Sequence, residues 1–469
     1  TQTEIIISGE PLPFFATVSE LCERERRYGR ADSARRGSRG RQPLAECRDS
    51  VPVGVWGRVP KKRTEDMKKI GFVIPWYADG IPGGAEMELR EVTSHLHAAG
   101  MNIEILTTCV KEFGADWSVN YYSEGEDKAA SGVIIRRFKV RKRDTAAFDA
   151  VNAKLMSRAA VTPEEEDVFL REMVNSPELY AYMEGHKDEY SLFVFIPYMF
   201  GTTYSGVKVC PEKSVLIPCF HDEAYAYLSR FKELFPKAAG MVFNARPEAE
   251  LSERIYGFSQ SGTKTIVMGI GMDTDITAEP AAFRSKFGID EPFILYAGRK
   301  DEGKNVHTLV KYYAEYIKRR ETDLRLVLIG GGNIELPEEL LRNGRIVDLG
   351  FVDKQDKYNA QGAAELLCQP SHNESFSLVI MESWLCGRPV LVHEECAVTK
   401  NFVSESNGGL YFGNYFEFEG CADYILNNKE TACLMGINGM NYVRKNFDWD
   451  IITEKYEKFF NDICGEVVQ

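Results

Sequence analysis

Short apolar runs alternate with longer amphipathic stretches along most of this chain, beginning at Met67. The runs have the length of parallel strands, which are apolar on both faces because helices cover both sides of their sheet. In the first half of the chain they are Ile70–Pro75, Ile103–Thr107, Leu192–Ile196 and Val215–Pro218. The stretch Ala85–Ala98 is typical of an amphipathic helix, and Gly100 follows it as a helix-ending glycine. The pattern predicts an α/β domain of strand–helix–strand units.

A second alternating series begins near Pro292, and its expected helices begin near Asn305, Gln355 and Ser377. Its expected strands are Phe293–Ala297, Leu326–Ile329, Ile346–Gly350, Leu366–Gln369 and Pro389–His393. The series predicts a second doubly wound, Rossmann-like domain, joined to the first near residues 273–285.

Further segments complete the expected organisation. Residues 144–190 interrupt the first series with acidic sequence in which Thr162, Pro163 and Glu165 form a helix-start pattern, so we expect a helical insertion there. The final stretch has the spacing of an amphipathic helix that must pack on something. The expected boundaries are 1–66 for a basic extension, 67–275 for the first domain, 276–450 for the second and 451–469 for the last helix.

The composition is that of a folded, acidic protein, with 44% hydrophobic and 27% charged residues and a formal charge of −13. Residues 1–66 hold 13 basic and 10 acidic residues, so they carry +3 and the other 403 residues carry −16. This balance argues against a protein that coats nucleic acid by neutralising phosphates. Because residues 1–66 are rich in Arg, Gly and Ser without a strand or helix period, we expect a disordered or non-native extension with no catalytic role.

The 11 cysteines are scattered along the chain without a Cys-x-x-Cys pair, which indicates reduced thiols in a cytoplasmic protein. The longest nearly apolar run, Leu192–Phe200, is far shorter than the roughly 20 residues that span a bilayer. Residues 136–143 hold six basic residues in eight. That segment is a candidate for peripheral contact with the inner face of an anionic membrane or with a lipid-diphosphate acceptor; the alternative is a solvated strand end and loop.

Two loops after expected strands carry groups suited to phosphate, and open α/β sheets bind ligands at this edge. Gly83 and Gly84 precede the first expected helix, so backbone N–H groups and the helix dipole can face an anion; a plain tight turn is the alternative. Arg299 and Lys304 follow the first strand of the second series, where a guanidinium and an ammonium can converge on one diphosphate.

A third loop holds the most specific pattern, since Glu374 and Glu382 stand eight positions apart around the helix expected from Ser377. N–H groups of that helix's first turn can bind phosphate, and the two carboxylates can accept hydrogen bonds from ribose and sugar hydroxyls. In the first domain, His221 opens a polar His-Asp-Glu triplet after an apolar strand. It can orient a substrate or assist proton movement, or it can serve only to cap a helix.

Taken in order, these motifs resemble those of the retaining glycosyltransferases of family 4, which have the GT-B fold. The resemblance covers about the last 403 residues and rests on "PGGAE", "HDE", "GR…GKN" and "ESFSLVIME". It implies an α/β protein of two doubly wound Rossmann-like domains facing a cleft, with a C-terminal helix that crosses back to the first domain. The sequence departs from the family at Ser377, where glycine is frequent, and in the helical insertion.

The resemblance also implies roles for individual residues. Arg299 and Lys304 would hold the nucleotide diphosphate and stabilise the leaving group, while Glu382 would bind the ribose hydroxyls. Glu374 would bind the transferred sugar, and His221 would contact it near the anomeric carbon. The implied catalytic residues are His221, Arg299, Lys304 and Glu374. The implied donor-binding residues are Gly83, Gly84, Arg299, Lys304, Gly331, Val352, Glu374, Ser375, Phe376, Ser377, Leu378 and Glu382.

The implied activity is transfer of a hexose, with retention of configuration, from a nucleotide diphosphate sugar to a glycan or lipid-linked acceptor, without a metal or other cofactor. The Asp-x-Asp patterns at Asp273–Asp275 and Asp448–Asp450 are interpreted as structural, in the interdomain link and at the start of the last helix. His95 and His97 lie on different faces of a helix and suit no shared zinc ion. The open alternatives are a nucleotide-sugar epimerase or phosphorylase of the same fold and a catalytically inactive sugar-nucleotide-binding subunit.

Overall fold

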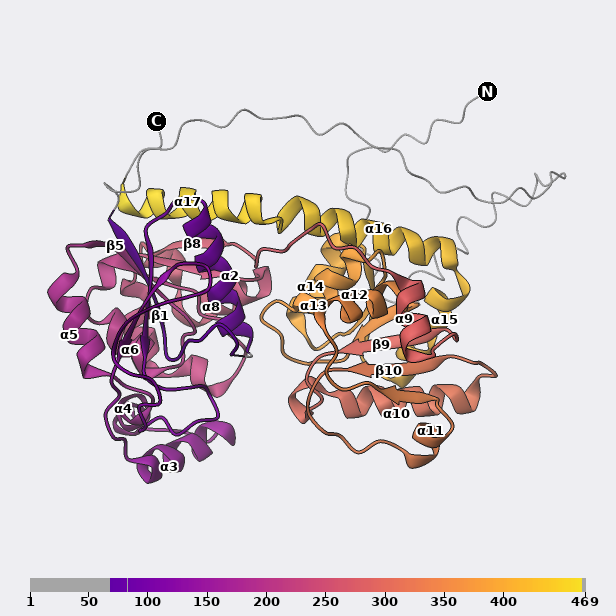
Figure 1. The fold of residues 1–469 in the computed structure, drawn as a ribbon. Coiled ribbons are helices and arrows are strands. Elements are labelled where there is room, and N and C mark those ends of the chain that lie inside the picture. The colour runs from indigo at the N-terminus through magenta and orange to yellow at the C-terminus, as the bar shows by residue number, and fades with distance from the viewer. Residues whose placement is uncertain (1–67, 82, 466–469) are drawn as a thin grey trace, which may run out of the picture.

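The computed structural model describes residues 68–81 and 83–465 as two α/β domains that lie side by side beneath a pair of long C-terminal helices (Figure 1). The predicted extension over residues 1–66 lies outside these residues. Within the described part of the chain, no helix is long and apolar enough to cross a membrane. The cysteines from Cys109 to Cys433 in that part are free thiols.

The N-terminal domain is built on one twisted sheet. Its strands are β1 (Lys69–Ile74), β2 (Ile103–Thr108), β3 (Gly125–Lys128), β4 (Ile134–Phe138), β5 (Tyr190–Phe195), β6 (Ser214–Leu216), β7 (Gly240–Phe243) and β8 (Lys264–Val267). Within the described residues their order is β3-β4-β2-β1-β5-β6-β7-β8, and all neighbours are parallel except β3 and β4. Phe72 and Ile74 of β1 point into one core and Val73 points into the other, which explains the continuous apolar run.

The helices of this domain are α2 (Gly84–Ala98), α3 (Thr145–Met156), α4 (Pro163–Glu172), α5 (Pro177–His186), α6 (Gly201–Val207), α7 (Ser229–Leu234) and α8 (Arg246–Tyr256). Three of them, α3 to α5, occupy the segment where the sequence predicts a helical insertion. The predicted helix start is confirmed, because the Thr162 hydroxyl accepts the backbone N–H of Glu165 and the Glu165 carboxylate accepts that of Thr162.

The C-terminal domain has a wholly parallel sheet. Its strands are β9 (Phe293–Ala297), β10 (Arg325–Ile329), β11 (Ile346–Asp348), β12 (Leu366–Gln369), β13 (Val390–His393) and β14 (Gly409–Phe412). In the described residues they run in the order β11-β10-β9-β12-β13-β14. Its helices are α9 (Pro280–Phe287), α10 (Val306–Arg319), α11 (Glu338–Arg342), α12 (Lys354–Ala363), α13 (Leu378–Leu385), α14 (Ala397–Ser406), α15 (Tyr415–Asn427) and α16 (Lys429–Asn446).

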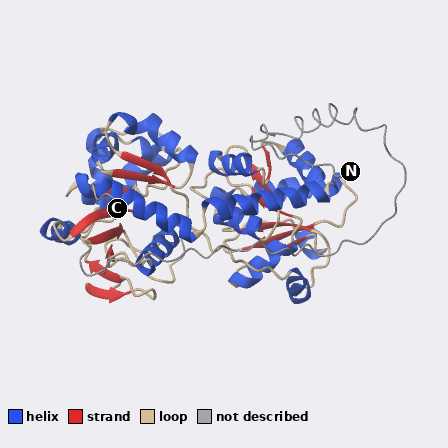
Figure 2. Cartoon of the chain, turned by 90° about the horizontal axis from the view of Figure 1, so that it is seen from above, coloured by secondary structure: helices blue, strands red, loops and turns tan. Residues whose placement is uncertain are grey.

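The last helix, α17 (Trp449–Cys464), crosses back to the N-terminal domain, where it packs on α2 and β5 (Figure 1). Figure 2, seen from above, shows the helices that lie over both sheets. Trp449 stacks on His95 of α2 with ring centroids 3.8 Å apart. Asp448 accepts the backbone N–H of Asp450, so this Asp-x-Asp pattern caps α17 as the sequence predicts. Two doubly wound domains joined by a crossing helix confirm the expected fold class.

Candidate functional site

The loops that follow β11, β10, β9 and β12 meet at one edge of the C-terminal sheet, because these strands are neighbours and all run in the same direction. They carry, in that spatial order, Val352, Gly331, the pair Arg299 and Lys304, and Glu374. The structure thus brings the main residues predicted for donor binding to a single edge, where open α/β sheets bind ligands.

Glycine allows two of these loops to pack against each other. Gly330 has φ 120°, and a Cβ on it would collide with the carbonyl oxygen of Gly298. Beside this contact Lys300 is buried, and its ammonium lies 2.5 Å from Asp348 Oδ1. The "AGRK" and "IGGGN" loops are therefore packed closely against each other, while the Arg299 side chain is exposed.

Lys304 and Glu374 form the centre of the predicted donor site. The Lys304 ammonium lies 2.7 Å from Glu374 Oε1, and the Gln369 side-chain amide donates to the same oxygen at 3.2 Å. Arg299, in contrast, is largely exposed and lies 3.3 Å from Asp301. The phosphate-binding pair expected from the sequence is thus one preorganised lysine and one exposed arginine.

The loop from Ser375 to Leu378 leads into α13, and its side chains divide between core and backbone roles. Phe376 is buried, with its ring 5.2 Å from that of Phe402 and 4.9 Å from that of Phe447. The Phe376 side chain belongs to the core. Of this residue, only the backbone N–H can therefore contact a bound sugar nucleotide. Ser377 caps the helix at φ 77°, in the left-handed region. This explains why glycine is frequent at this position.

Glu382, one turn into α13, is buried and held by two side chains of α12. Lys357 lies 2.6 Å from its Oε1, and the Gln361 amide donates to its Oε2 at 3.3 Å. Sequence reasoning missed Lys357, Gln361 and Gln369. No local motif marks them, and only the folded chain places them against the two glutamates.

In the N-terminal domain, the loop that carries Gly83 and Gly84 follows β1 and leads into α2. Trp76 Nε1 donates to Glu86 Oε1 at 2.5 Å, which fixes the first turn of the helix next to the two glycines. Gly83 has φ 152°, and a Cβ on it would collide with the Glu86 carboxylate. The positive φ therefore favours glycine at this position, and contact of this turn with an anion stays a prediction.

His221 follows β6, two strands from β1 in the same sheet. Glu248 of α8 fixes the backbone before it, since Glu248 Oε1 accepts the N–H of Phe220 at 2.7 Å. Burial, with a contribution from the positive charge of Lys304, lowers the pKa of His221 to about 4. Two consequences follow: His221 is a neutral imidazole near pH 7, and it lies within electrostatic reach of a lysine from the other domain.

A buried polar cluster lies behind the His221 loop. Asn244 donates to Glu88 Oε2 at 2.9 Å, and the Cys219 thiol lies 3.6 Å from the same oxygen. Burial raises the pKa of Glu88 and that of Glu248 to about 8 each, against the hydrogen bonds that they accept. Both carboxyl groups are therefore mostly protonated at neutral pH.

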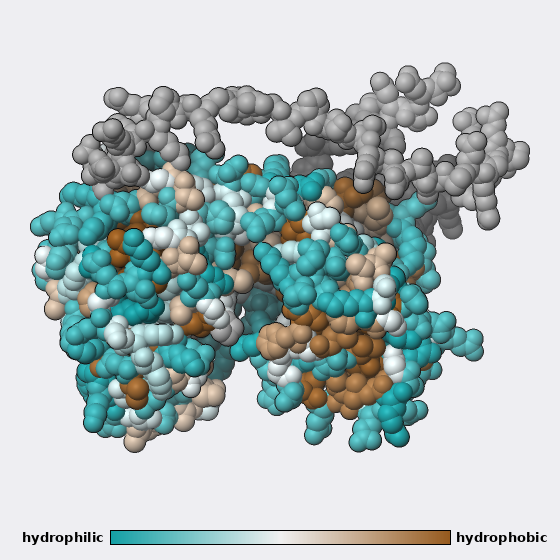
Figure 3. All heavy atoms as spheres, viewed as in Figure 1, coloured by the Kyte–Doolittle hydropathy of each residue, from teal (hydrophilic) through white to brown (hydrophobic). Residues whose placement is uncertain are grey.

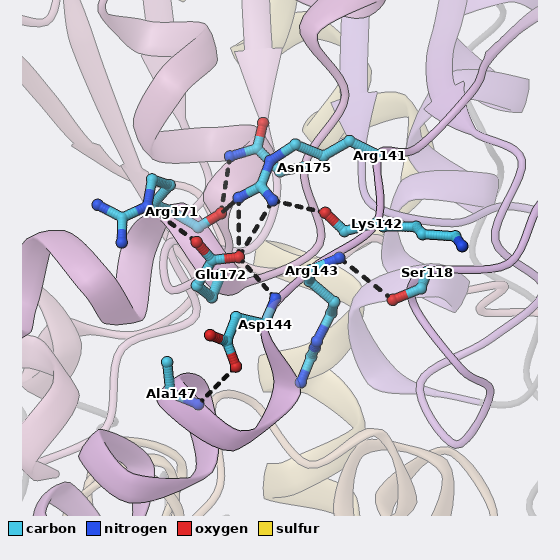
Figure 4. Close-up of polar contacts among 9 residues, drawn as sticks. All are labelled: Ser118, Arg141, Lys142, Arg143, Asp144, Ala147, Arg171, Glu172 and Asn175. Atoms are coloured by element: carbon cyan, nitrogen blue, oxygen red, sulfur yellow. Dashed lines mark hydrogen bonds and ion pairs between the residues drawn. The ribbon is translucent and has the colours of Figure 1, made fainter.

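Most side chains of the basic segment 136–143 are paired with acidic or aromatic neighbours, although Lys139 and Lys142 are exposed. Arg136 lies 2.7 Å from Glu104, Lys139 lies 2.7 Å from Glu124, and Arg143 stacks over the rings of Trp117 and Phe148. Figure 4 shows Arg141 aimed at the buried carboxylate of Glu172, which also accepts the backbone N–H of Asp144. Lys142 is exposed. The segment is thus the end of β4 and a loop, as the alternative to membrane contact expects, and the loop is cross-linked by ion pairs.

One group among the described residues has the spacing of metal ligands: His372, His393 and Glu395 offer atoms within 4.8 Å of one another. The Asn305 amide nitrogen lies 3.0 Å from the carbonyl of Pro370 and 2.8 Å from His372 Nε2, so it donates to both. This network assigns the proton of neutral His372 to Nδ1, which faces Glu395. A hydrogen-bonded chain accounts for the group, and we assign no metal to it.

A hollow separates the two domains in the space-filling view (Figure 3). His221 of the N-terminal domain lies within electrostatic reach of Lys304, which is paired with Glu374 in the C-terminal domain. Two Rossmann-like domains with ligand-binding loops on facing walls define the GT-B class of fold.

Comparison with known proteins agrees with this class. Residues 279–440 match the family model "Glycosyl transferases group 1". The D-inositol 3-phosphate glycosyltransferase of Saccharomonospora viridis is 30% identical over 178 residues, which are 34% of this chain and 41% of that protein. The alignment thus spans less than half the length of this curated relative.

Solved structures resemble the chain over most of its length. Sucrose-phosphate synthase from Thermosynechococcus elongatus superposes with a TM-score of 0.62 at 17% identity, over 86% of this chain and 100% of that one. Anabaena HepE, in complex with UDP and glucose, gives 0.57 at 16% identity, over 84% and 100%. At these identities the likeness to solved structures establishes the GT-B fold alone, and the match to the family model is confined to residues 279–440 of the C-terminal half.

Proposed function

We propose that this chain is a retaining glycosyltransferase that moves a hexose from a nucleotide diphosphate sugar to a hydroxyl group of a glycan or lipid-linked acceptor. The observation that carries the proposal is the pairing across the hollow: Lys304, held by Glu374, lies close enough to His221 to lower its pKa. This proximity supports a role for Lys304 as the cation that meets the leaving diphosphate and for His221 as a neutral imidazole that contacts the sugar. The UDP and glucose bound to HepE support a nucleotide-sugar donor.

The proposed reaction breaks the bond from the anomeric carbon to the β-phosphate oxygen and forms one from that carbon to the acceptor oxygen. Lys304 and Arg299 stabilise the negative charge that develops on the diphosphate. The acceptor attacks from the face that the diphosphate leaves, and its proton passes to a departing phosphate oxygen. Configuration is then retained without a carboxylate nucleophile or a metal. His221, as a neutral imidazole, hydrogen-bonds the sugar and orients it.

The same fold also supports epimerases and phosphorylases, and an inactive donor-binding subunit is a further alternative. Transfer is favoured over an inactive copy because Lys304 keeps its contact with Glu374, Glu382 keeps its contact with Lys357, and His221 is present in the other domain. Product analysis separates the enzymatic alternatives: an epimerase changes the donor without an acceptor, and a phosphorylase consumes phosphate.

A panel of UDP-, GDP- and ADP-hexoses, assayed for binding and slow hydrolysis, tests the proposal. We expect Lys304→Ala to lower kcat by about 10² to 10³, the cost of removing one group that stabilises transition-state charge. Glu382→Ala should weaken donor binding by about tenfold or more. Lys318→Ala, an exposed lysine of α10, is the matched control. Unchanged binding and turnover in both site variants would refute the proposal, as would a product of inverted anomeric configuration.

A further inference from the structure

The two glutamates of the site are held in the same way. Glu374 accepts hydrogen bonds from the side chains of Lys304 and Gln369. Glu382 accepts them from the side chains of Lys357 and Gln361. The motifs that point to a donor site include Lys304, whereas no motif includes Lys357. The repeated arrangement raises the question of what the second lysine contributes.

Lys357 is built into the wall of the site. It projects from α12, and its ammonium lies 2.6 Å from Glu382 Oε1 and 5.4 Å from the centre of the Tyr358 ring. Its side chain is 26% exposed, while that of Glu382 is 9% exposed, so the lysine forms the outer, reachable member of the pair. Within the described residues, Glu382 is the one hydrogen-bond acceptor of this ammonium.

An ammonium has three N–H donors, so one bond to Glu382 leaves two for a ligand. A carboxylate also keeps free lone pairs after accepting from Lys357 and Gln361. A group that both donates to the carboxylate and accepts from the neighbouring ammonium is therefore complementary to this pair. A hydroxyl does both with a single oxygen, and the vicinal diol of a ribose offers two hydroxyls side by side.

We propose that Lys357 is a ribose-binding residue that works with Glu382 to select donors with a ribose diol over deoxyribose donors. The inference rests on the proposed function, because it names a further determinant of the same donor site. Glu382 accepts hydrogen bonds from the hydroxyls, and Lys357 donates to their oxygens. Loss of a hydroxyl leaves the Lys357–Glu382 pair intact but removes the hydrogen bonds that its remaining N–H donors and lone pairs make to the ligand, and these are costly to lose at a partly buried site.

The test compares the binding of UDP, GDP and ADP with that of their 2′,3′-dideoxy forms, by calorimetry, for the wild type and two variants. The wild type should prefer the ribose form of its nucleotide by about 100-fold, and Lys357→Met should lower that preference about tenfold, the value of one charge-assisted hydrogen bond. Lys354→Met is the matched control. Lys354 lies on the same helix and over the same Tyr358 ring, but it pairs with Asp273.

The outcomes separate the two proposals. If none of the three diphosphates binds the wild type, the proposed function fails and this inference falls with it. If the wild type binds one of them and Lys357→Met weakens the ribose and dideoxy forms equally, Lys357 serves only to hold Glu382, and the inference is wrong while the proposed function stands. Should Lys357→Met not fold, Lys357→Gln keeps a donor toward Glu382; an unchanged ribose preference in that variant would equally overturn the inference.

Discussion

Ser377 combines two unfavourable features at the centre of the site. Its φ of 77° lies in the left-handed region, which costs a residue with a side chain roughly 1–2 kcal/mol. Its hydroxyl is buried and makes no hydrogen bond within the described residues. The sequence shows only that serine stands where glycine is frequent. The backbone supplies the reason, and the strain is confined to the helix start that we propose for donor binding.

This strain predicts an effect of substitution on stability. Ser377→Ala removes the unpaired hydroxyl and keeps the strained φ, whereas Ser377→Gly removes both. We therefore expect the glycine variant to exceed the alanine variant in unfolding free energy by about 1 kcal/mol, after allowance for the larger entropy of glycine in the unfolded chain. Urea denaturation at pH 7 measures the difference. Equal stability of the two variants would show that the left-handed conformation is relaxed at this position.

Other side chains of the site show where sequence reasoning ends. Lys304 and Glu374 could be predicted because each belongs to a local pattern after an apolar strand. Lys357 and Gln361 could not, since they stand 25 and 21 positions from Glu382 and meet it only through the packing of α12 on α13. For Phe376, only part of the predicted contact with the sugar nucleotide remains possible. Its side chain lies in the core, so the prediction now concerns its backbone alone.

At the scale of elements, most strands with two buried faces were predictable, but β7 and β14, which are fully buried and begin with glycine, were missed. β9 (Phe293–Ala297) and β12 (Leu366–Gln369) have the predicted bounds, because an unbroken apolar run of this length between polar loops has few alternatives. β8 has mostly exposed side chains, and β4 carries the arginines of the basic segment. The two arginines of β4 interrupt the apolar run by which a strand is predicted. In the folded protein, ion pairs between Arg136 and the neighbouring strands stabilise β4.

The loop after β4 predicts a strong structural effect of one carboxylate. Glu172 accepts hydrogen bonds from Arg141, Arg171 and the backbone of Asp144 (Figure 4). Burial opposes its ionisation, but these donors lower its pKa to about 2. Glu172→Gln should therefore lower the unfolding free energy at pH 7 by about 2–3 kcal/mol, because it leaves buried donors poorly paired.

A control variant and a control pH test whether the loss of stability in Glu172→Gln comes from the ionised carboxylate. Glu178→Gln, at an exposed carboxylate of α5, should change stability by less than about 0.5 kcal/mol. Because the pKa of Glu172 is lowered in the folded protein, its ionised carboxylate stabilises the fold above about pH 4.5, and this contribution is lost as the pH falls toward 2. The difference in unfolding free energy between the wild type and Glu172→Gln should therefore shrink in acid. A difference in unfolding free energy that persists unchanged at pH 2 would contradict the assignment.

Membrane contact through residues 136–143 stays a prediction. Lys142 is exposed, so reversal of its charge tests that contact without disturbing the ion pairs around Glu172.

At the scale of the whole molecule, α17 joins two domains whose facing loops form the site. Its residues pack against the N-terminal sheet: a Cβ on Gly240 of β7 would meet Phe459 and Ile463. Near its start, Thr274 of the interdomain link donates to Asp448 at 2.5 Å. The amphipathic pattern predicted this helix, and the resemblance predicted its crossing. Neither indicated that Tyr456 of α17 lies within electrostatic reach of the buried carboxyl of Glu88.

That buried cluster predicts how stability depends on pH. Burial raises the pKa of Glu88 and of Glu248 to about 8, well above the ordinary value of 4.5, so the folded protein retains protons that the unfolded chain releases. Their contribution is complete below about pH 4.5 and is lost as pH rises toward 8. His221 acts oppositely, since its pKa of about 4 makes stability rise with pH only up to its ordinary value of 6.5. Above pH 6.5 the two carboxyl groups, and not this histidine, should therefore determine how the stability changes with pH.

We accordingly expect the Tm of the wild type to fall between pH 6.5 and pH 8, and that of Glu88→Gln to fall less. The amide keeps the shape of a protonated carboxyl and cannot ionise, so its advantage over the wild type should grow with pH across this window. Scanning calorimetry of both proteins in buffers of equal ionic strength measures the two slopes. Glu253→Gln, at an exposed residue of α8, controls for the loss of one carboxylate. Parallel curves for the wild type and Glu88→Gln would show that Glu88 is ionised in the folded protein, and would remove the protonated cluster from behind the His221 loop.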